Sequence, residues 1–190
     1  MQIIIQAVES RLDNVLKMLN DLPDETIIHV DKERKGTFGS FVDILNNYEI
    51  KGPRLHLQDD VILAKGFEIY LETLKRDFVN EEMNVLSLFS LKRKKVTLAY
   101  KNLEKYAEYH PFLMLQSVIF SERVLKGMKE YVKTNKFNHD DVMVREYLKL
   151  KNIKAKVHLP NIVQHNIYLG SEINHPNSKN RMSPYYVNKI

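Results

Sequence analysis

Residues 2–31 read QIIIQAVESRLDNVLKMLNDLPDETIIHVD, and this stretch decides the fold class. Residues 2–8 form a β-branched run with almost no polar interruption, which is typical of a strand buried on both faces. After Ser10, which we interpret as a helix N-cap, apolar residues recur at helical spacing until Pro23. A second strand is predicted over residues 26–30. Two strands joined by an amphipathic helix form a βαβ unit, so the strands should be parallel.

The rest of the chain continues this alternation less regularly. In the first half the patterns predict a helix over 38–45, a strand over 54–58, a helix carrying Phe67, Tyr70, Leu71 and Leu74, and a strand over 84–89. In the second half they predict a strand over 112–120, helices over 121–134 and from Asp140 onward, a strand over 156–159 and an irregular tail over 159–190. The predicted fold is α/β, with a mixed, mainly parallel central sheet flanked by helices.

Length and composition exclude several classes of protein. The 190 residues fit one domain, and 44% hydrophobic residues with only 6 Gly and 6 Pro disfavour collagen-like or disordered chains. The absence of cysteine excludes a disulfide scaffold, a thiolate zinc site and a cysteine nucleophile. No apolar run approaches the roughly 20 residues that span a bilayer, and no secretion signal is visible, so we expect a cytoplasmic protein that contacts no membrane.

The net charge of +5 is compatible with a nucleotide or nucleic acid ligand, or with a solvated surface rich in lysine. The basic run over residues 92–95 can also be interpreted in two ways. It forms a solvated loop, or it contacts the phosphates of a polyanionic acceptor such as DNA.

Two adjacent carboxylates, Asp59 and Asp60, follow the strand that is predicted to end at Gln58. This position lies at the carboxyl edge of the sheet, where open α/β folds bind their ligands. Because two buried like charges need compensation, a hard divalent cation that also contacts substrate phosphates would suit them. The alternative interpretation is a capping or turn pair without a ligand.

Two further segments are candidates for a site. His165 follows a short apolar stretch and precedes Gly170 and Ser171, a plausible place for a site residue, although a lone histidine is more often a hydrogen-bonded core residue. Asp140 and Asp141 open a predicted helix, where acidic residues are common as caps. One of these carboxylates could instead act as a general base.

Taken in order, these pieces resemble small glycosyltransferases of the GT-A fold, over about residues 1–175. The sequence Gln58-Asp59-Asp60-Val61 resembles the metal-binding D-x-D motif in its Glu-Asp-Asp variant. Residues 160–171 resemble a P-S-L-V-Q-H-x-G-x-x-S segment. The resemblance implies one GT-A-like catalytic domain over 1–190, with a nucleotide-binding half over 1–90, an acceptor half over 91–175 and a tail over 176–190.

The resemblance implies a metal site at Asp60. This residue would coordinate Mn²⁺ or Mg²⁺ bridging the diphosphate of a nucleotide sugar, and His165 would approach the same metal or diphosphate. Asp59 would contact the sugar or ribose. Gln58 stands where an acid is common, which lowers the local negative charge and the expected grip on the metal.

The resemblance also implies roles for residues outside the Asp pair. Asp31 would hold the nucleoside, and Ser10 and Arg11 would lie on the base and phosphate side. Asp140 or Asp141 would supply the catalytic base of an inverting reaction, in which the acceptor attacks from the face opposite the leaving group.

The main hypothesis is therefore a metal-dependent glycosyltransferase that moves a sugar from a nucleotide donor, with a UDP-sugar the first choice, to a hydroxyl acceptor. DNA is the acceptor in a narrower version, and a viral source would place the protein in the host cytoplasm. One rival is a non-catalytic nucleotide- or nucleic-acid-binding module on the same fold. Another is an α/β protein with unrelated partners.

Overall fold

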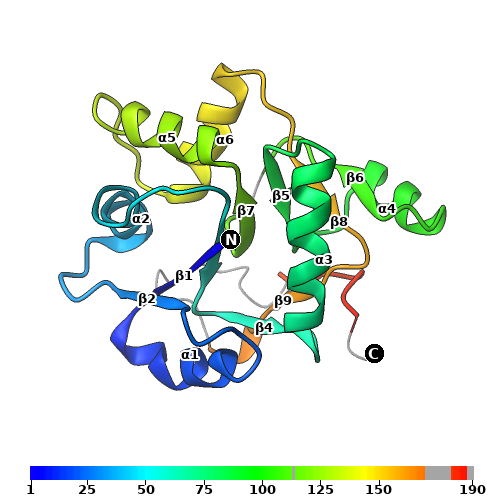
Figure 1. The fold of residues 1–190 in the computed structure, drawn as a ribbon, viewed down its shortest axis with the longest axis horizontal. Helices are drawn as coiled ribbons and strands as arrows, with labels where there is room; N and C mark the ends of the chain where they lie inside the picture. Colours follow the sequence, from blue (N-terminus) through cyan, green and yellow to red (C-terminus); the bar gives the residue numbers. More distant parts are fainter. Residues whose placement is uncertain (113, 170–180, 188–190) are drawn as a thin grey trace.

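The computed structural model describes residues 1–112, 114–169 and 181–187, and its centre is a seven-stranded sheet of order β2-β1-β3-β7-β5-β8-β6 (Figure 1). The strands of this sheet are β1 (Gln2–Ala7), β2 (Ile27–Val30), β3 (Arg54–Gln58), β5 (Val85–Ser87), β6 (Tyr106–Glu108), β7 (Ser117–Phe120) and β8 (Lys156–His158). Only β7 and β6 run against the other five strands. The predicted mixed, mainly parallel α/β sheet is confirmed.

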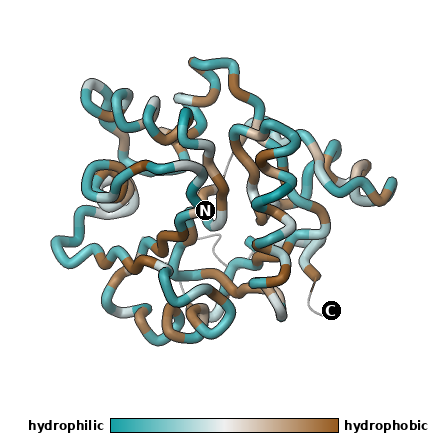
Figure 2. The backbone as a smooth tube through the Cα atoms, in the orientation of Figure 1, coloured by the Kyte–Doolittle hydropathy of each residue, from teal (hydrophilic) through white to brown (hydrophobic). Residues whose placement is uncertain are grey.

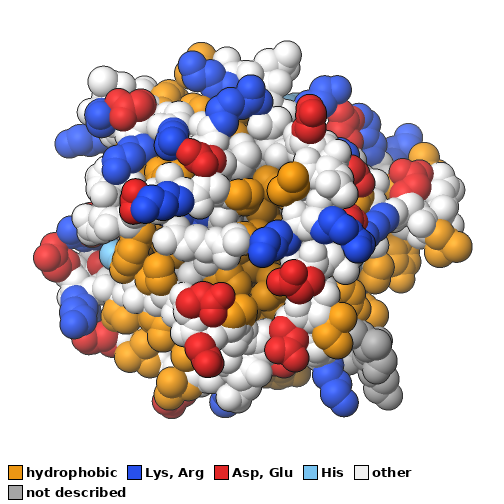
Figure 3. Space-filling model, in the orientation of Figure 1, with side chains coloured by type: hydrophobic (Ala, Val, Ile, Leu, Met, Phe, Trp, Pro, Cys, Tyr) orange, Lys and Arg blue, Asp and Glu red, His pale blue; other side chains and the backbone are white. Residues whose placement is uncertain are grey.

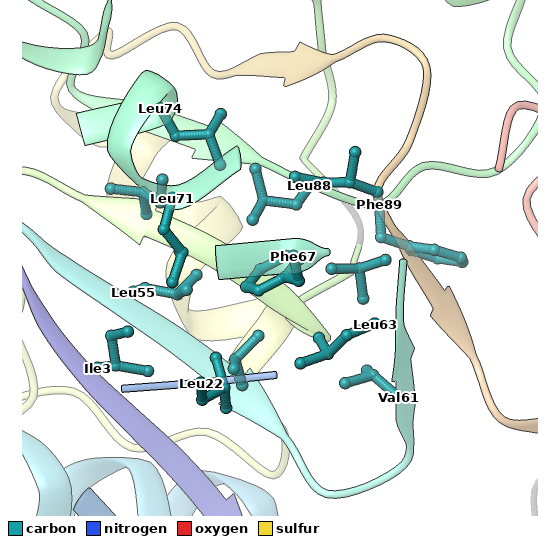
Figure 4. Packing of buried hydrophobic residues seen from close by; sticks show 14 of the residues in the cluster. Ile3, Leu22, Leu55, Val61, Leu63, Phe67, Leu71, Leu74, Leu88 and Phe89 are labelled. Atoms are coloured by element: carbon teal, nitrogen blue, oxygen red, sulfur yellow. The ribbon is translucent and has the colours of Figure 1, made fainter. Parts of the chain in front are cut away.

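Helices cover both faces of this sheet. They are α1 (Leu12–Leu19), α2 (Gly36–Asn47), α3 (Phe67–Asn80), α4 (Lys94–Lys101), α5 (Glu122–Tyr131) and α6 (Asp140–Leu150), with short 3-10 helices η1 (Glu9–Arg11) and η2 (Ile167–Leu169). One hydrophobic core lies under α1 and α3, and a second lies under α2, α5 and α6. Figure 4 shows part of the first core, where Phe67 and Leu71 of α3 pack over Leu55 of β3. Figure 2 shows the hydrophobic strands inside a hydrophilic outer trace.

The opening βαβ unit forms as its sequence predicts, except at the start of its helix. β1 pairs in parallel with β2, Ile4 opposite Ile27, and five of the six residues of β1 are buried. Ser10, however, lies inside η1, and α1 begins only at Leu12 with Arg11 in the N-cap position. The prediction that Ser10 caps the helix is wrong because the chain first makes a 3-10 turn.

The strand predicted over residues 112–120 is much shorter in the structure. Only Ser117–Phe120 forms β7, which lies antiparallel between β3 and β5, with Ile119 opposite both Leu55 and Leu86. Phe112 and Leu115 are nevertheless buried in the second core, so their hydrophobicity serves packing rather than strand pairing. β7 joins β3 and β5, two strands of the predicted nucleotide-binding half, into one sheet.

The predicted irregular tail contains a strand that completes a small second sheet. β9 (Val163–His165) pairs antiparallel with β4 (Val61–Leu63), which directly follows the two carboxylates after β3. The basic run also differs from the predicted loop, since Lys94 and Lys95 form the first turn of α4. In the described part of the chain no helix has the length and apolarity to cross a bilayer.

Candidate functional site

The carboxyl ends of β1, β2 and β3 meet at one edge of the sheet and open into a pocket. The backbone holds the residues after these strands together, since Asp31 N donates to Ala7 O (2.8 Å) and Asp59 N donates to Gln6 O (3.1 Å). The cavity measures about 150 Å³, and its polar lining residues include Gln6, Arg11, Asp31, Thr37, Ser40, Gln58, Asp59, Asp60, Gln116, His165 and Arg181. The Asp59–Asp60 pair, the first candidate motif of the sequence, therefore lies at a pocket.

Asp59 is anchored by its own chain. Its Oδ2 accepts a hydrogen bond from Val8 N (2.7 Å), and its Oδ1 accepts one from Arg11 Nη1 (2.9 Å). Burial raises the pKa of Asp59, and the hydrogen bond and charge of Arg11 only partly offset this. Asp59 thus ties the loop after β1 to the end of β3, while the expected contact with sugar or ribose stays a prediction.

Asp60 is held more loosely than Asp59. Its Oδ2 lies 3.3 Å from both Arg11 Nη1 and His165 Nε2, at the long end of the hydrogen-bond range. Its Oδ1 is buried and has no hydrogen-bond partner among the described residues. Burial raises the pKa of Asp60, but His165, Arg11 and Arg181 outweigh it, so the pKa lies below its ordinary value. The low pKa favours the ionised form of Asp60, and one of its oxygens is unpaired in the part of the chain that the structure describes.

The β4–β9 pair brings His165 to Asp60 across 105 residues of sequence. Val61 lies opposite His165 in the register, and Asn166 N donates to Asp60 O (2.7 Å). His165 is 3% exposed, and its Nδ1 lacks a partner in the described residues. Asp60 and His165, which the resemblance assigns to the same metal or diphosphate, therefore lie together in one cluster with Arg11.

Asn14, which sequence reasoning missed, fixes the turn that carries the two carboxylates. Its Nδ2 donates to Asp59 O (2.7 Å) and to Val61 O (3.1 Å), and its Oδ1 accepts from Asn166 Nδ2 (3.1 Å). A buried asparagine on the core-facing side of α1, where the neighbouring buried residues are apolar, was the signal that could have found it.

The structure separates Asp31 from Ser10. Asp31 lines the pocket, and its two carboxylate oxygens accept hydrogen bonds from Lys35 N (2.9 Å) and Gly36 N (3.0 Å), so it fixes the start of α2. Gly36 has φ +74°, a left-handed conformation that suits glycine. Ser10 is exposed and is not part of the pocket lining, so the structure does not bring it to the other candidates.

Asp140 lies in a second hollow that adjoins the pocket. Thr37, Gln58, Gln116 and Arg181 line both openings. Asp140 is 3% exposed, its Oδ2 accepts from Gln58 Nε2 (3.1 Å), and its Oδ1 accepts from the backbone N of residue 141 (2.8 Å).

Burial, reinforced by the charge of Asp141, raises the pKa of Asp140 to about 7. Such a value suits a general base at neutral pH, whereas Asp141 is only partly buried at the first turn of α6.

Several buried polar atoms of the pocket lining lack partners within the described part of the chain. They are Gln6 Oε1, Ser40 Oγ and Gln116 Oε1, in addition to Asp60 Oδ1 and His165 Nδ1. Unpaired buried polar groups are costly, and native proteins keep few of them. All five atoms belong to residues that line one cavity, where a polar ligand could complete their hydrogen bonds.

The donor set fits a divalent metal that shares its coordination with a substrate. Asp60 offers an unused carboxylate oxygen and His165 an imidazole nitrogen, a combination that suits Mn²⁺ better than the oxygen-preferring Mg²⁺. No cluster of three or more possible protein ligands occurs in the described ranges. Any metal here would therefore take its remaining ligands from phosphate oxygens and water.

Comparisons by sequence identify no relative. No family model matches the chain, and no curated protein matches it either.

Solved structures show likeness at the level of the fold. A197 from STIV has 14% identity and a TM-score of 0.48, with 86% of this chain and 84% of that chain covered. A CMP:2-keto-3-deoxy-manno-octonic acid synthetase complexed with CTP has 12% identity and a TM-score of 0.44, covering 82% and 88%. A putative glucose-1-phosphate thymidylyltransferase from Bacillus anthracis has 11% identity and a TM-score of 0.48, covering 93% and 74%. None of the three descriptions names a glycosyltransferase.

Most of the predicted site residues gather at the pocket. Arg11, Asp31, Asp59, Asp60 and His165 line it, and Asp140 lies in the adjoining hollow. Gly170 and Ser171, part of the motif after His165, lie outside the described residues. The pocket lining also includes Ser40, Gln116 and Arg181, whose local sequence patterns give no signal of a site.

Proposed function

We propose that the protein transfers a sugar from a nucleoside diphosphate sugar to a hydroxyl acceptor with the help of a divalent metal. One observation carries this proposal. Among the described residues, the Asp60–His165 pair keeps an unpartnered carboxylate oxygen beside a pocket that adjoins the hollow of Asp140. A metal-ligating pair beside a candidate base is the arrangement that such a displacement needs.

The phosphate side of the donor would lie near Asp60. When bound there, the metal would stabilise the negative charge that develops on the leaving diphosphate. Arg11 and Arg181 both line the pocket, and their guanidinium groups can hydrogen-bond phosphate oxygens. Arg11 already contacts Asp59 and Asp60, so it can position the diphosphate relative to both carboxylates.

The acceptor side of the site would depend on Asp140. A carboxylate whose pKa is about 7 is substantially ionised at neutral pH and can accept the proton of an attacking hydroxyl. Gln58 Nε2 donates to Asp140 Oδ2, and this bond orients the carboxylate. If Asp140 lies across the sugar from the diphosphate, the reaction inverts the configuration.

The nucleoside would occupy the part of the pocket near β1 and α2. Gln6 Oε1 is an unpartnered acceptor in the described chain, while Gln6 Nε2 donates to Thr37 O (3.0 Å). A pyrimidine imide N–H, as in uridine, would satisfy this acceptor, so a UDP-sugar is the first donor to test. Asp31, which fixes α2, would keep this wall in place.

Nucleotidyl transfer from a triphosphate is the neighbouring chemistry to separate from this proposal. Triphosphates are commonly cradled by glycine-rich loops whose backbone N–H groups face the phosphates. Residues 1–35, which include the loop after β1, contain no glycine. This favours a diphosphate donor held by side chains and metal.

A donor-hydrolysis assay tests the proposal without knowledge of the acceptor, because water can replace the acceptor hydroxyl. UDP-, GDP- and dTDP-sugars would be incubated with Mn²⁺, and release of the nucleoside diphosphate would be measured between pH 5 and 9. We expect metal-dependent release whose rate rises with pH and levels off above the pKa of Asp140, about 7. Asp140→Asn should lower the rate by about 100-fold or more.

The matched control is Asp141→Asn, which removes the neighbouring carboxylate and should stay within about tenfold of the wild-type rate. An unchanged rate and pH profile in Asp140→Asn would contradict the assignment of the base. Nucleotide binding without turnover would favour the non-catalytic module. Release of pyrophosphate from a nucleoside triphosphate and a sugar phosphate would show nucleotidyl transfer instead.

A further inference from the structure

One short segment around α4, which we call the α4 surface (residues 92–105), carries a dense positive charge. This segment holds six Lys or Arg residues and one Glu, a net charge of +5 that equals the net charge of the whole chain. The remaining residues carry equal numbers of basic and acidic side chains. Six basic side chains within 14 residues form a dense local charge that attracts anionic surfaces.

The α4 surface also exposes large hydrophobic side chains. Leu98 is 60% exposed and Leu103 is 92% exposed, while Val96 and Ala99 bury the opposite side of α4 in the second core. Lys94, Lys95 and Lys101 lie three or four residues from Leu98 and therefore share its face. In Figure 1, α4 projects from the side of the molecule next to β6, and Figure 3 shows exposed hydrophobic side chains on this projection.

Leu103 occupies a position that does not favour leucine. It follows α4 with φ 58°, and the turn closes through Glu104 N donating to Ala99 O (3.0 Å). Glycine or asparagine adopts this left-handed conformation at helix ends with less strain. A nearly fully exposed leucine at this turn therefore gains nothing inside the folded chain, which suggests a contact outside it.

We propose that the α4 surface docks the protein on a membrane surface rich in anionic lipid. Lys95 and Lys105 already pair with Glu108 and Asp77, so the attraction to lipid headgroups rests mainly on Lys92, Arg93, Lys94 and Lys101. Basic side chains beside exposed leucines fit a lipid interface, where headgroups meet the charges and acyl chains meet the leucines. A nucleic acid would meet the charges alone and leave both leucines in water.

This proposal revises the expectation that the protein contacts no membrane. Docking at a lipid surface requires no membrane-crossing helix, so it agrees with the lack of such a helix in the described residues. The α4 surface is also connected to the candidate site. Thr97 Oγ1 and Tyr185 OH share a hydrogen bond (2.5 Å), and Tyr185 lies in the segment 181–187 that includes Arg181 of the pocket lining. A docked α4 would therefore hold this segment against the lipid side of the molecule.

Vesicle co-sedimentation tests the proposal. Wild-type protein would be mixed with phosphatidylcholine vesicles, and with vesicles that contain about 30% phosphatidylserine, at about 0.05 M and about 0.3 M salt. We expect binding to the anionic vesicles alone, weakened by salt. The double variants Leu98→Ser/Leu103→Ser and Lys94→Gln/Lys101→Gln should each lower the partition coefficient by at least about tenfold.

The control variant is Leu16→Ser/Leu150→Ser, which removes two leucines of similar exposure, 61% and 63%, from other helices. It should bind anionic vesicles as the wild type does, and thermal melting would show that every variant is folded. Equal binding of the leucine variant and the wild type would overturn the proposal. So would the absence of vesicle binding combined with salt-dependent binding of duplex DNA, which would make the α4 surface a nucleic-acid contact. Neither outcome depends on whether the pocket transfers sugar.

Discussion

At the scale of the residue, the site contains buried polar groups, and hydrogen bonds and neighbouring charges offset only part of the free-energy cost of burying them. Asp60 and His165 each keep one unpaired buried atom among the described residues, and Asp140 carries a raised pKa. Gln58 stands where the D-x-D-like motif commonly has an acidic residue. Its side-chain amide donates a hydrogen bond to Asp140 Oδ2, which an ionised carboxylate could not do. This hydrogen bond would let Gln58 orient Asp140, the proposed base, in addition to lowering the negative charge beside the proposed metal.

His56 predicts a measurable dependence of stability on pH. It is 1% exposed, packs edge-on against Phe41 at 5.0 Å, and has no hydrogen-bond partner in the described chain. Burial, with smaller effects of Arg54 and His29, lowers its pKa from 6.5 to about 3. Because the unfolded chain binds this proton below about pH 6.5 and the folded chain does not, the contribution of His56 to stability falls as the pH drops through this window.

Urea unfolding at pH 7 and pH 5 would measure the effect. Between these values the wild type should lose about 2 kcal/mol relative to His56→Leu. Asp140, whose pKa is raised to about 7, stabilises both proteins equally as the pH falls, so the difference between them isolates His56. The exposed His110 provides the control, because His110→Leu should keep the wild-type loss. An equal loss in His56→Leu and the wild type would show that His56 does not titrate as its burial requires.

At the scale of the element, the β4–β9 pair and helix α1 hold the two carboxylates in place. Asn14 of α1 bonds the backbone on both sides of Asp60, and β9 closes the turn from the opposite side. Asn14→Ala should leave two buried carbonyls unpaired and lower the free energy of unfolding by about 2 kcal/mol. Asn20→Ala, at the exposed end of the same helix, should change it by less than about 0.5 kcal/mol.

Urea unfolding of the two asparagine variants at pH 7 checks this prediction. Equal free energies of unfolding for Asn14→Ala and Asn20→Ala would contradict the prediction. They would mean that water replaces the hydrogen bonds of Asn14 and that the turn is stable without this side chain.

The local hydrophobic pattern of the sequence predicts the strands and helices that have a buried face. It does not predict the long-range strand pairings and side-chain contacts that complete the site. The run at β1 and the end of β3 at Gln58 follow from hydrophobicity and the residues that interrupt it. β4 and β9 have three residues each, too few for a period, and their pairing joins segments about 100 residues apart. Likewise, the bond between Gln58 and Asp140 spans 82 residues. Such contacts depend on the tertiary fold, which single-sequence periodicity does not contain.

At the scale of the whole molecule, two features lie at different places on the fold. The pocket opens at the carboxyl ends of β1 and β3, while the α4 surface projects beside β6 at the far edge of the sheet (Figure 1). Residues 181–187 connect them, since Asn161 Oδ1 accepts from Ser183 Oγ (2.5 Å) and Gln164 Oε1 accepts from Ser183 N (2.8 Å). Because Gln164 and His165 are adjacent in β9, the same short strand anchors this segment and carries the candidate metal ligand.

The most direct test of the central claim, that Asp60 and His165 hold a metal together with a nucleotide, is a thermal-shift measurement. Wild type, Asp60→Asn and the exposed control Asp13→Asn would be melted with UDP, GDP, CDP or dTDP, each with and without Mn²⁺. A nucleotide at about 100 times its Kd should add roughly 2.7 kcal/mol of stability, a shift of several degrees. We predict a Mn²⁺-dependent shift with one nucleotide in the wild type and in Asp13→Asn, and none in Asp60→Asn. A shift that Asp60→Asn retains, or no shift with any nucleotide, would contradict the account.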